Sequence, residues 1–210
     1  MNSRPPILAI KDPAALQLAA SLVSSGELIA FPTDTVYGIG ACAFVPEAVD
    51  RIYQVKGRSH NKAIPILLAD PEDLDRITPP LSLTAARLVQ AFWPGPLTLV
   101  VPLLPSLPEN LSPGPTIGVR IPDHDWTRAL LRAAGPLAAT SANLSGEPPA
   151  TTAAEVLDQL GKRVSLILED GTSPGGLPST VLDCTGEEPA LLREGPLSWN
   201  LIVEVLSQDS

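Results

Sequence analysis

A short basic segment occurs in an otherwise acidic chain. Arg51, Lys56, Arg58 and Lys62 belong to a total of only 14 lysines and arginines, and no basic residue lies between Lys11 and Arg51. The formal net charge of −9 disfavours broad binding to nucleic acid, because phosphate contacts need a basic face. A local cationic cluster on an acidic protein predicts an anionic small ligand instead.

Polar side chains occur where predicted strands begin or end. They follow the strands predicted at residues 27–31 and 137–139 and precede the one at 180–183. In open α/β sheets, ligands bind in crevices at strand ends, so these side chains are expected to converge on one pocket. The residues concerned are Thr33, Asp34, Thr35, Thr140, Ser141, Asn143 and Ser179.

Each of these residues also has a purely structural interpretation. Thr33 and Thr35 could satisfy backbone groups in a turn, which is the commoner use of such side chains. Lys56 ends a predicted helix, where the helix dipole favours a cation without any function. Arg120 is harder to explain in this way, because a buried guanidinium on an apolar strand needs an anionic partner.

The elements that must position these residues alternate between helix and strand. In the first helix we expect Asp12 as N-cap, Pro13 in the first turn and Gly26 at the end. Further helices are predicted at 46–56, 82–92, 124–134, 152–160 and 198–206, and strands at 27–31, 64–68, 97–101, 117–121, 137–139, 164–168, 180–183 and 190–192. Several strands are apolar on both faces, which indicates an α/β domain with a largely covered sheet.

Composition and cysteine use set the class of protein. Apolar residues make up 44% and charged residues 18% of 210, as in a globular chain. No apolar run is long enough to span a bilayer and no signal-peptide core is visible, so we expect a cytoplasmic protein without membrane partners. Cys42 and Cys184 form no CxxC pair, and His60 and His124 complete no metal-ligand spacing; two buried free thiols are expected.

Familiar nucleotide-binding and hydrolase motifs are missing. There is no GxxxxGK[ST] motif and no GxSxG elbow. Residues 38–43 match GxGxx[GA], but a polar segment separates these glycines from the preceding strand. A dinucleotide fold would need a tight strand-turn-helix at this place, so this interpretation is disfavoured.

Seven ordered segments resemble the YrdC family. They are FPTDTVYGIG (31–40), KGRSHNKAIPILL (56–68), WPGPLTLV (93–100), GVRIPDH (118–124), TSANLSGEPPATT (140–152), PSTVLDCT (178–185) and LLREG (191–195). The family's KxR and SxN elements are present at 56–58 and 141–143. The resemblance covers residues of roughly 27 to 197, and seven segments in the family's order are far more specific than any one of them.

The resemblance implies a twisted open α/β sandwich with a large concave cavity. It implies synthesis of threonylcarbamoyl-AMP from L-threonine, bicarbonate and ATP, with release of pyrophosphate and with magnesium accompanying ATP. The product would pass to partner proteins that modify adenosine in tRNA. We expect one domain over residues 1–210, with a core of about 12–197 and a C-terminal helix of about 198–206, as in the short, single-domain bacterial type.

The resemblance also assigns roles to individual residues. Lys56 and Arg58 are the expected catalytic residues. Threonine or carbamate contacts are expected from Thr33, Thr35, Arg120, Ser141 and Ser179. Nucleotide contacts are expected from Lys56, Arg58, Lys62, Thr140, Asn143, Thr151 and Arg193. No metal bound by protein side chains is expected.

Three alternatives remain at the level of the sequence. A paralogue of the YciO type would share much of the motif set but act on another small substrate. A non-catalytic RNA-binding module would need a basic face, and the charge of −9 makes strong RNA binding unexpected. In a purely structural α/β domain, the polar loops would be capped turns only.

Overall fold

The computed structural model describes residues 4–207, and within them ten strands form one sheet. The strands are β1 (Ile7–Ala9), β2 (Ile29–Phe31), β3 (Gly38–Cys42), β4 (Ile66–Leu67), β5 (Leu97–Pro102), β6 (Thr116–Arg120), β7 (Leu137–Ser141), β8 (Leu166–Glu169), β9 (Thr180–Asp183) and β10 (Ala190–Arg193). Their order across the sheet is β1-β8-β2-β3-β7-β4-β6-β5-β9-β10, with parallel and antiparallel pairs mixed.

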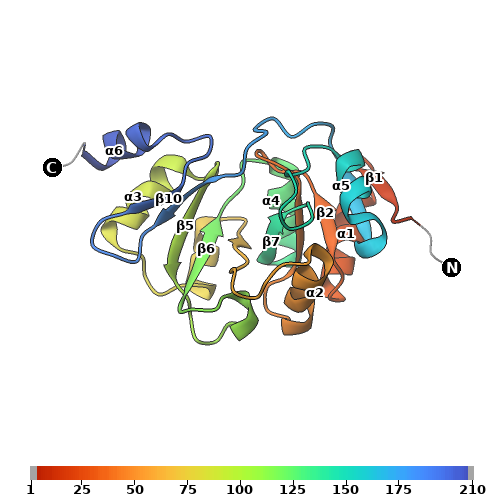
Figure 1. The fold of residues 1–210 in the computed structure, drawn as a ribbon, viewed down its shortest axis with the longest axis horizontal. Coiled ribbons are helices and arrows are strands. Elements are labelled where there is room, and N and C mark those ends of the chain that lie inside the picture. The colour runs from red at the N-terminus through yellow and green to blue at the C-terminus, as the bar shows by residue number, and fades with distance from the viewer. Residues whose placement is uncertain (1–3, 208–210) are drawn as a thin grey trace.

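Six α-helices pack against this sheet in the described part of the chain. They are α1 (Ala15–Ser24), α2 (Pro46–Lys56), α3 (Leu83–Phe92), α4 (Asp125–Ala134), α5 (Ala153–Leu160) and α6 (Trp199–Ser207). Short 3-10 helices lie at Pro71–Arg76, Glu109–Leu111 and Gly161–Arg163. Figure 1 shows α3, α6 and β10 at one end of the molecule and α1, α5 and β1 at the other.

The central strands are apolar on both faces, as the sequence predicts. Ile29 and Phe31 of β2 pack into one apolar cluster, whereas Ala30 between them packs into the other. Leu166 and Ile167 of β8 divide between the two clusters in the same way. Because successive strand side chains point to opposite faces, each of these strands is buried between two layers. The expected α/β fold with a covered sheet is confirmed.

The two faces of the sheet are not covered equally. Helices α2, α3, α5 and α6 bury side chains in the larger cluster, whereas α1 and α4 bury theirs in the smaller one. The fully buried strand residues of the smaller cluster come from β2, β4, β7 and β8. Strands β5, β6 and β9 therefore carry helices on one face, and their other face remains available for a ligand.

Capping side chains lie at the starts of three helices, where the sequence places them. Ser82, His124 and Thr152 each accept a hydrogen bond from a backbone N–H three residues later, at the starts of α3, α4 and α5. The expectation for α1 is wrong by two residues. Its N-cap is Ala14, and Asp12 instead accepts from the backbone N–H of Ala14 in a preceding turn.

Strand β3 is absent from the strands expected from the sequence, and its two glycines are residues that are usually depleted in strands. Here the aromatic ring of Phe31 lies where side chains at Gly38 and Gly40 would be. A Cβ on Gly38 would lie 3.2 Å from Phe31 Cε2, and one on Gly40 would lie 3.1 Å from Phe31 Cε1. The glycines let the strand pass under a large ring. A strand in this place also excludes the strand-turn-helix of a dinucleotide fold.

The remaining differences concern the edges of the sheet and the cysteines. Strand β1 was not predicted; it pairs with β8 and extends the sheet to residues before position 12. Both cysteines are free, but Cys42 is only partly buried. None of the helices between residues 4 and 207 is long and apolar enough to cross a bilayer.

We expect Gly40→Ala to destabilise the protein by about 1–3 kcal/mol, because its Cβ would lie 3.1 Å from both Ala138 O and Phe31 Cε1. The matched control is Gly114→Ala, whose Cβ would have no atom within 4 Å, and it should change stability by less than about 0.5 kcal/mol. Urea denaturation of both variants measures the difference. Equal stabilities would show that the ring and the strand do not restrict this position.

Candidate functional site

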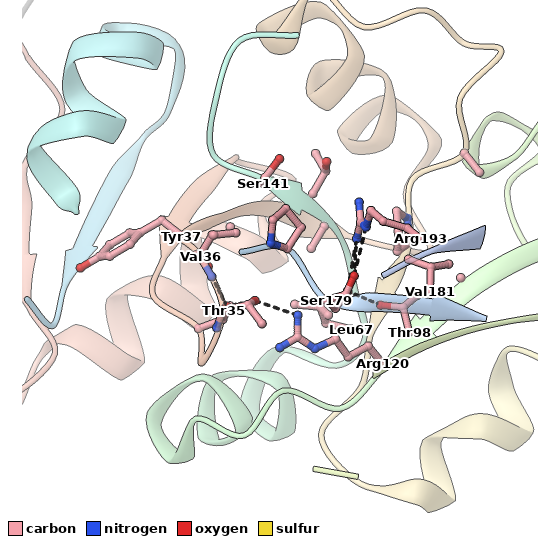
Figure 2. A pocket seen from close by; sticks show the side chains of 18 of the residues that line it. Thr35, Val36, Tyr37, Leu67, Thr98, Arg120, Ser141, Ser179, Val181 and Arg193 are labelled. Atoms are coloured by element: carbon pink, nitrogen blue, oxygen red, sulfur yellow. Dashed lines mark hydrogen bonds between the residues drawn. The ribbon is translucent and has the colours of Figure 1, made fainter. Parts of the chain in front are cut away.

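A pocket of about 280 Å³ lies on the face of the sheet that helices leave open. Its floor uses alternate residues of neighbouring strands, as expected when one face of a sheet forms a surface. Figure 2 shows several of these side chains directed toward the same space from different strands. The lining residues are Thr33, Thr35, Val36, Tyr37, Gly38, Arg58, Ala63, Pro65, Leu67, Thr98, Val100, Gly118, Arg120, Ala139, Thr140, Ser141, Pro178, Ser179, Val181 and Arg193.

The loop that follows β2 is organised by Thr33. Its hydroxyl donates to Val36 O at 2.6 Å and accepts from the backbone N–H groups of Thr35 and Val36. The hydroxyl of Thr35 lies 3.0 Å from that of Thr33 and also accepts from Arg120 at 2.9 Å. Thr33 therefore has the structural role that the sequence allows for it, and both hydroxyls also line the pocket.

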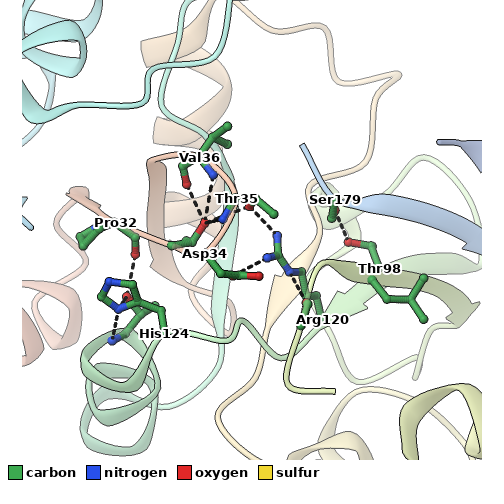
Figure 3. A network of polar contacts seen from close by, with 12 residues as sticks. Pro32, Asp34, Thr35, Val36, Thr98, Arg120, His124 and Ser179 are labelled. Carbon is green, nitrogen blue, oxygen red and sulfur yellow. Dashed lines mark hydrogen bonds and ion pairs between the residues drawn. The ribbon is translucent and has the colours of Figure 1, made fainter. Parts of the chain in front are cut away.

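Arg120 is buried, and its anionic partner comes from the chain itself. Its Nη2 donates to Asp34 Oδ1 at 2.5 Å, Nη1 to Thr35 Oγ1, and Nε to Gly95 O (Figure 3). Burial lowers the pKa of Arg120, and the charge of Asp34 acts in the opposite direction. Three of the five N–H donors of a guanidinium are thus occupied, so two remain for a ligand in the pocket.

Two more guanidinium groups line the pocket, and each is held by backbone carbonyl oxygens. Arg58 donates to Ala63 O at 2.8 Å, and Arg193 donates to Ser179 O through Nε at 3.0 Å and Nη2 at 2.8 Å. Burial lowers the pKa of both side chains. No aspartate or glutamate is among the lining residues, and Arg58 and Arg193, unlike Arg120, are held without a carboxylate partner.

Hydroxyl groups lie beside these cations. Ser179 Oγ lies 2.8 Å from Thr98 Oγ1, and both side chains are buried (Figure 2). Thr140 and Ser141 come from the end of β7 on the other side of the pocket. The pocket can therefore offer hydrogen bonds from several directions to an anionic ligand with polar groups.

Four of the twelve residues to which the family resemblance assigns a role do not line the pocket. Lys56 and Asn143 are buried behind its wall, where the Lys56 ammonium contacts carbonyl oxygens of residues 141 and 143. Lys62 is exposed, and Thr151 is half-buried and hydrogen-bonded to Glu155 through both its backbone N–H and its hydroxyl. The remaining eight expected site residues all line it.

A segment between β8 and β9 crosses the site, and this was not predicted from the sequence. Residues 170–178 connect β8, near one edge of the sheet, to β9, near the other. Gly171 O accepts from the Tyr37 hydroxyl, and Gly176 N donates to Thr35 O. A Cβ on Gly175 would lie 2.7 Å from Asp34 O, so only glycine allows this approach. The sequence Pro174-Gly175-Gly176 indicates a turn. The loop that it contacts, at residues 34 and 35, lies far away in the chain, so the contact itself could not be predicted.

No metal centre is visible among residues 4–207, because no three His, Cys, Asp or Glu side chains come together there.

The family model described as "Sua5_yciO_yrdC: Telomere recombination" matches residues 21–195. Threonylcarbamoyl-AMP synthase of Bacillus subtilis is 42% identical over 205 residues, which cover 95% of this chain and 58% of that protein. The structure of Pyrococcus abyssi Sua5 complexed with L-threonine is 36% identical with a TM-score of 0.93, covering 96% of this chain and 61% of that one. Escherichia coli YciO is 28% identical with a TM-score of 0.83, covering 92% and 97%.

The chain therefore spans about three fifths of the length of the first two of these relatives.

We expect Asp34→Asn to destabilise the protein by about 3–5 kcal/mol, because it leaves the buried Arg120 cation without its counter-charge. The double variant Asp34→Asn/Arg120→Met should recover at least half of this loss, because no unpaired charge remains. Urea denaturation measures both. The control is Arg51→Gln, which breaks the exposed pair with Glu27 and should cost less than about 1 kcal/mol. Additive losses in the double variant would contradict the expected coupling.

Stability should also depend on pH through Lys56. Burial, and then the charge of Arg58, lower the pKa of Lys56 from 10.5 to about 7. Unfolding therefore takes up a proton between these two pH values, so the stability from this group rises with pH across that window and is lost as the pH falls through about 7. Denaturation of the wild type and Lys56→Met at about pH 6, 7.5 and 9 tests this. Parallel pH profiles would show that the pKa is not lowered.

Proposed function

The chain belongs to the Sua5/YciO/YrdC family, and from this membership we propose that it makes threonylcarbamoyl-AMP from L-threonine, bicarbonate and ATP. One observation in the structure supports this most directly. Three guanidinium groups and several hydroxyls converge on one pocket whose lining includes no carboxylate. A carboxylated amino acid and a nucleotide phosphate are both anionic, so this lining suits the two substrates together.

The reaction has two steps, both suited to such a pocket. The amine of threonine forms a C–N bond with carbon dioxide and loses a proton, or with bicarbonate and releases water, and either route gives a carbamate anion. A carbamate oxygen then attacks the α-phosphorus of ATP, a new P–O bond forms, and the bond to the bridging oxygen breaks as pyrophosphate leaves. The nucleophile is already an anion, so no strong side-chain base is needed. Catalysis then depends on positioning and on neutralising phosphate charge.

The positions of the side chains support a proposed role for each of them. We assign threonine and carbamate contacts to Thr33, Thr35, Arg120, Ser141 and Ser179. The free N–H groups of Arg120 suit a carboxylate, because a planar fork binds two oxygens at once. The hydroxyl of Ser179 is oriented by Thr98, to which it is hydrogen-bonded.

Phosphate contacts are assigned to the two remaining guanidinium groups of the pocket, Arg58 and Arg193, with Thr140 beside them. Lys62 lies outside the lining on the exposed loop that carries Arg58, where it can meet the outer phosphates of ATP. Thr151 lies further away and is assigned to the nucleoside end. Magnesium enters with ATP as part of the substrate and not as a metal held by the protein.

The wider setting follows from the product. An adenylated threonylcarbamoyl group is activated for transfer, so proteins that modify adenosine in tRNA are the proposed recipients. We place the reaction in the cytoplasm, where tRNA is modified. The net charge of −9 disfavours direct, strong binding of RNA by this chain.

We expect pyrophosphate release from labelled ATP only when threonine and bicarbonate are both present. Arg58→Ala should lower kcat/KM by about 10²–10³, as for loss of one preorganised donor. The control is Lys162→Ala, which removes an exposed lysine remote from the pocket lining and should leave turnover unchanged. Circular dichroism checks that both variants are folded. Release that does not depend on threonine would favour a paralogue of the YciO type with another substrate.

A further inference from the structure

Lys56 is a buried cation that does not line the pocket. Its side chain is at the end of α2, and the residue is 3% exposed. The ammonium donates to the backbone oxygen of Ser141, to that of Asn143 at 2.6 Å, and to Asn143 Oδ1 at 3.5 Å. In its charged form, which predominates below the lowered pKa of about 7, this group has three N–H donors and no acceptor, so these three oxygens can use the full capacity of that form.

The backbone of Lys56 holds the same loop from a second point. Its carbonyl oxygen accepts from Ser145 N at 2.9 Å, and the adjacent Gly57 has a φ of 59°, which ends α2 in the left-handed conformation. The loop after β7 is therefore fixed to the end of α2 by both the side chain and the backbone of one residue.

Asn143 is also committed to this loop. Its Nδ2 donates to Leu144 O at 2.8 Å and to Glu147 O at 2.7 Å, while its Oδ1 accepts from Lys56. Both amide N–H groups are thus used within residues 143–147, and the side chain has no donor left for a nucleotide. The KxR and SxN elements meet through Lys56 and Asn143 as one folded unit.

This unit adjoins two hydroxyl side chains of the pocket. Ser141 pairs with Gly38 across the β3–β7 ladder, and Thr140 and Ser141 both line the pocket. The carbonyl oxygen of Ser141 is bound by Lys56, so the position of its Cα, and with it of its hydroxyl, depends on that contact. A shift of about 1 Å at such a position is enough to weaken a site by a large factor.

We propose that Lys56 is a positioning residue for this reaction, which fixes the backbone of residues 141–143 from behind the pocket wall so that Thr140 and Ser141 face the substrates, and that it does not contact the triphosphate. The proposal rests on the function proposed above. It separates the two cations of the KxR element, because Arg58 lines the pocket whereas Lys56 supports its wall.

The test is threonine binding by calorimetry in the absence of ATP. Lys56→Met should weaken threonine binding by about tenfold, the effect of one misplaced hydrogen bond to the ligand. Ser141→Ala should weaken it similarly, and the double variant should be little worse than either single variant, because both changes remove the same contact. Lys162→Met, which changes an exposed lysine, is the matched control and should bind as the wild type does.

Unchanged threonine affinity in Lys56→Met, with a loss confined to ATP, would overturn the proposal. If this variant does not fold, nuclear magnetic resonance of the ¹⁵N-lysine-labelled wild type decides. At about pH 6, below the lowered pKa of Lys56, its ammonium signal should be protected from exchange with water and change little when magnesium and ATP are added. A coupling to ³¹P would overturn the proposal. Failure of the wild type to release pyrophosphate with threonine would instead refute the proposed function.

Discussion

The pocket depends on a buried cation that the fold cannot leave unpaired. Arg120 lies on β6 in the middle of the sheet, where an isolated charge would be very unfavourable. Asp34 supplies the counter-charge from the loop after β2, at 2.5 Å. The pair joins strands that belong to different parts of the sheet and fixes the loop that carries Thr33 and Thr35. The need to pair one buried charge thus fixes the part of the pocket wall that carries Thr33 and Thr35.

The same ion pair allows a buried arginine to line the pocket without placing a carboxylate among the lining residues. Asp34 neutralises Arg120 without being among the lining residues, whereas Arg58 and Arg193 are held by carbonyl oxygens, which orient a guanidinium without cancelling its charge. The pocket therefore remains positive within an acidic protein of net charge −9. Such a local field attracts small anions to one place and gives no extended basic surface for a polymer.

Much of the fold could be predicted because its signals are local. Capping residues and apolar periodicity place α2 to α5 within a residue of their observed bounds. Strand β3 could not be predicted, because its glycines are explained by a tertiary contact: the Phe31 ring packs where their side chains would lie. At the site, residue types indicated twelve candidate side chains, and eight of them line the pocket. Which of them line the pocket is a long-range property: Lys56 and Asn143 have the expected chemistry, but both are buried and hydrogen-bonded to each other.

The segment that crosses the pocket between β8 and β9 is attached mainly through its backbone. Ser173 N donates to Thr151 O, Gly176 N donates to Thr35 O, and Gly171 O accepts from Tyr37. Main-chain contacts do not depend on which side chain a residue carries. A change of side chain at an exposed position of this stretch, such as Leu177, should therefore leave these contacts in place, whereas Gly175 has no room for a Cβ and Gly171 and Gly176 have positive φ angles.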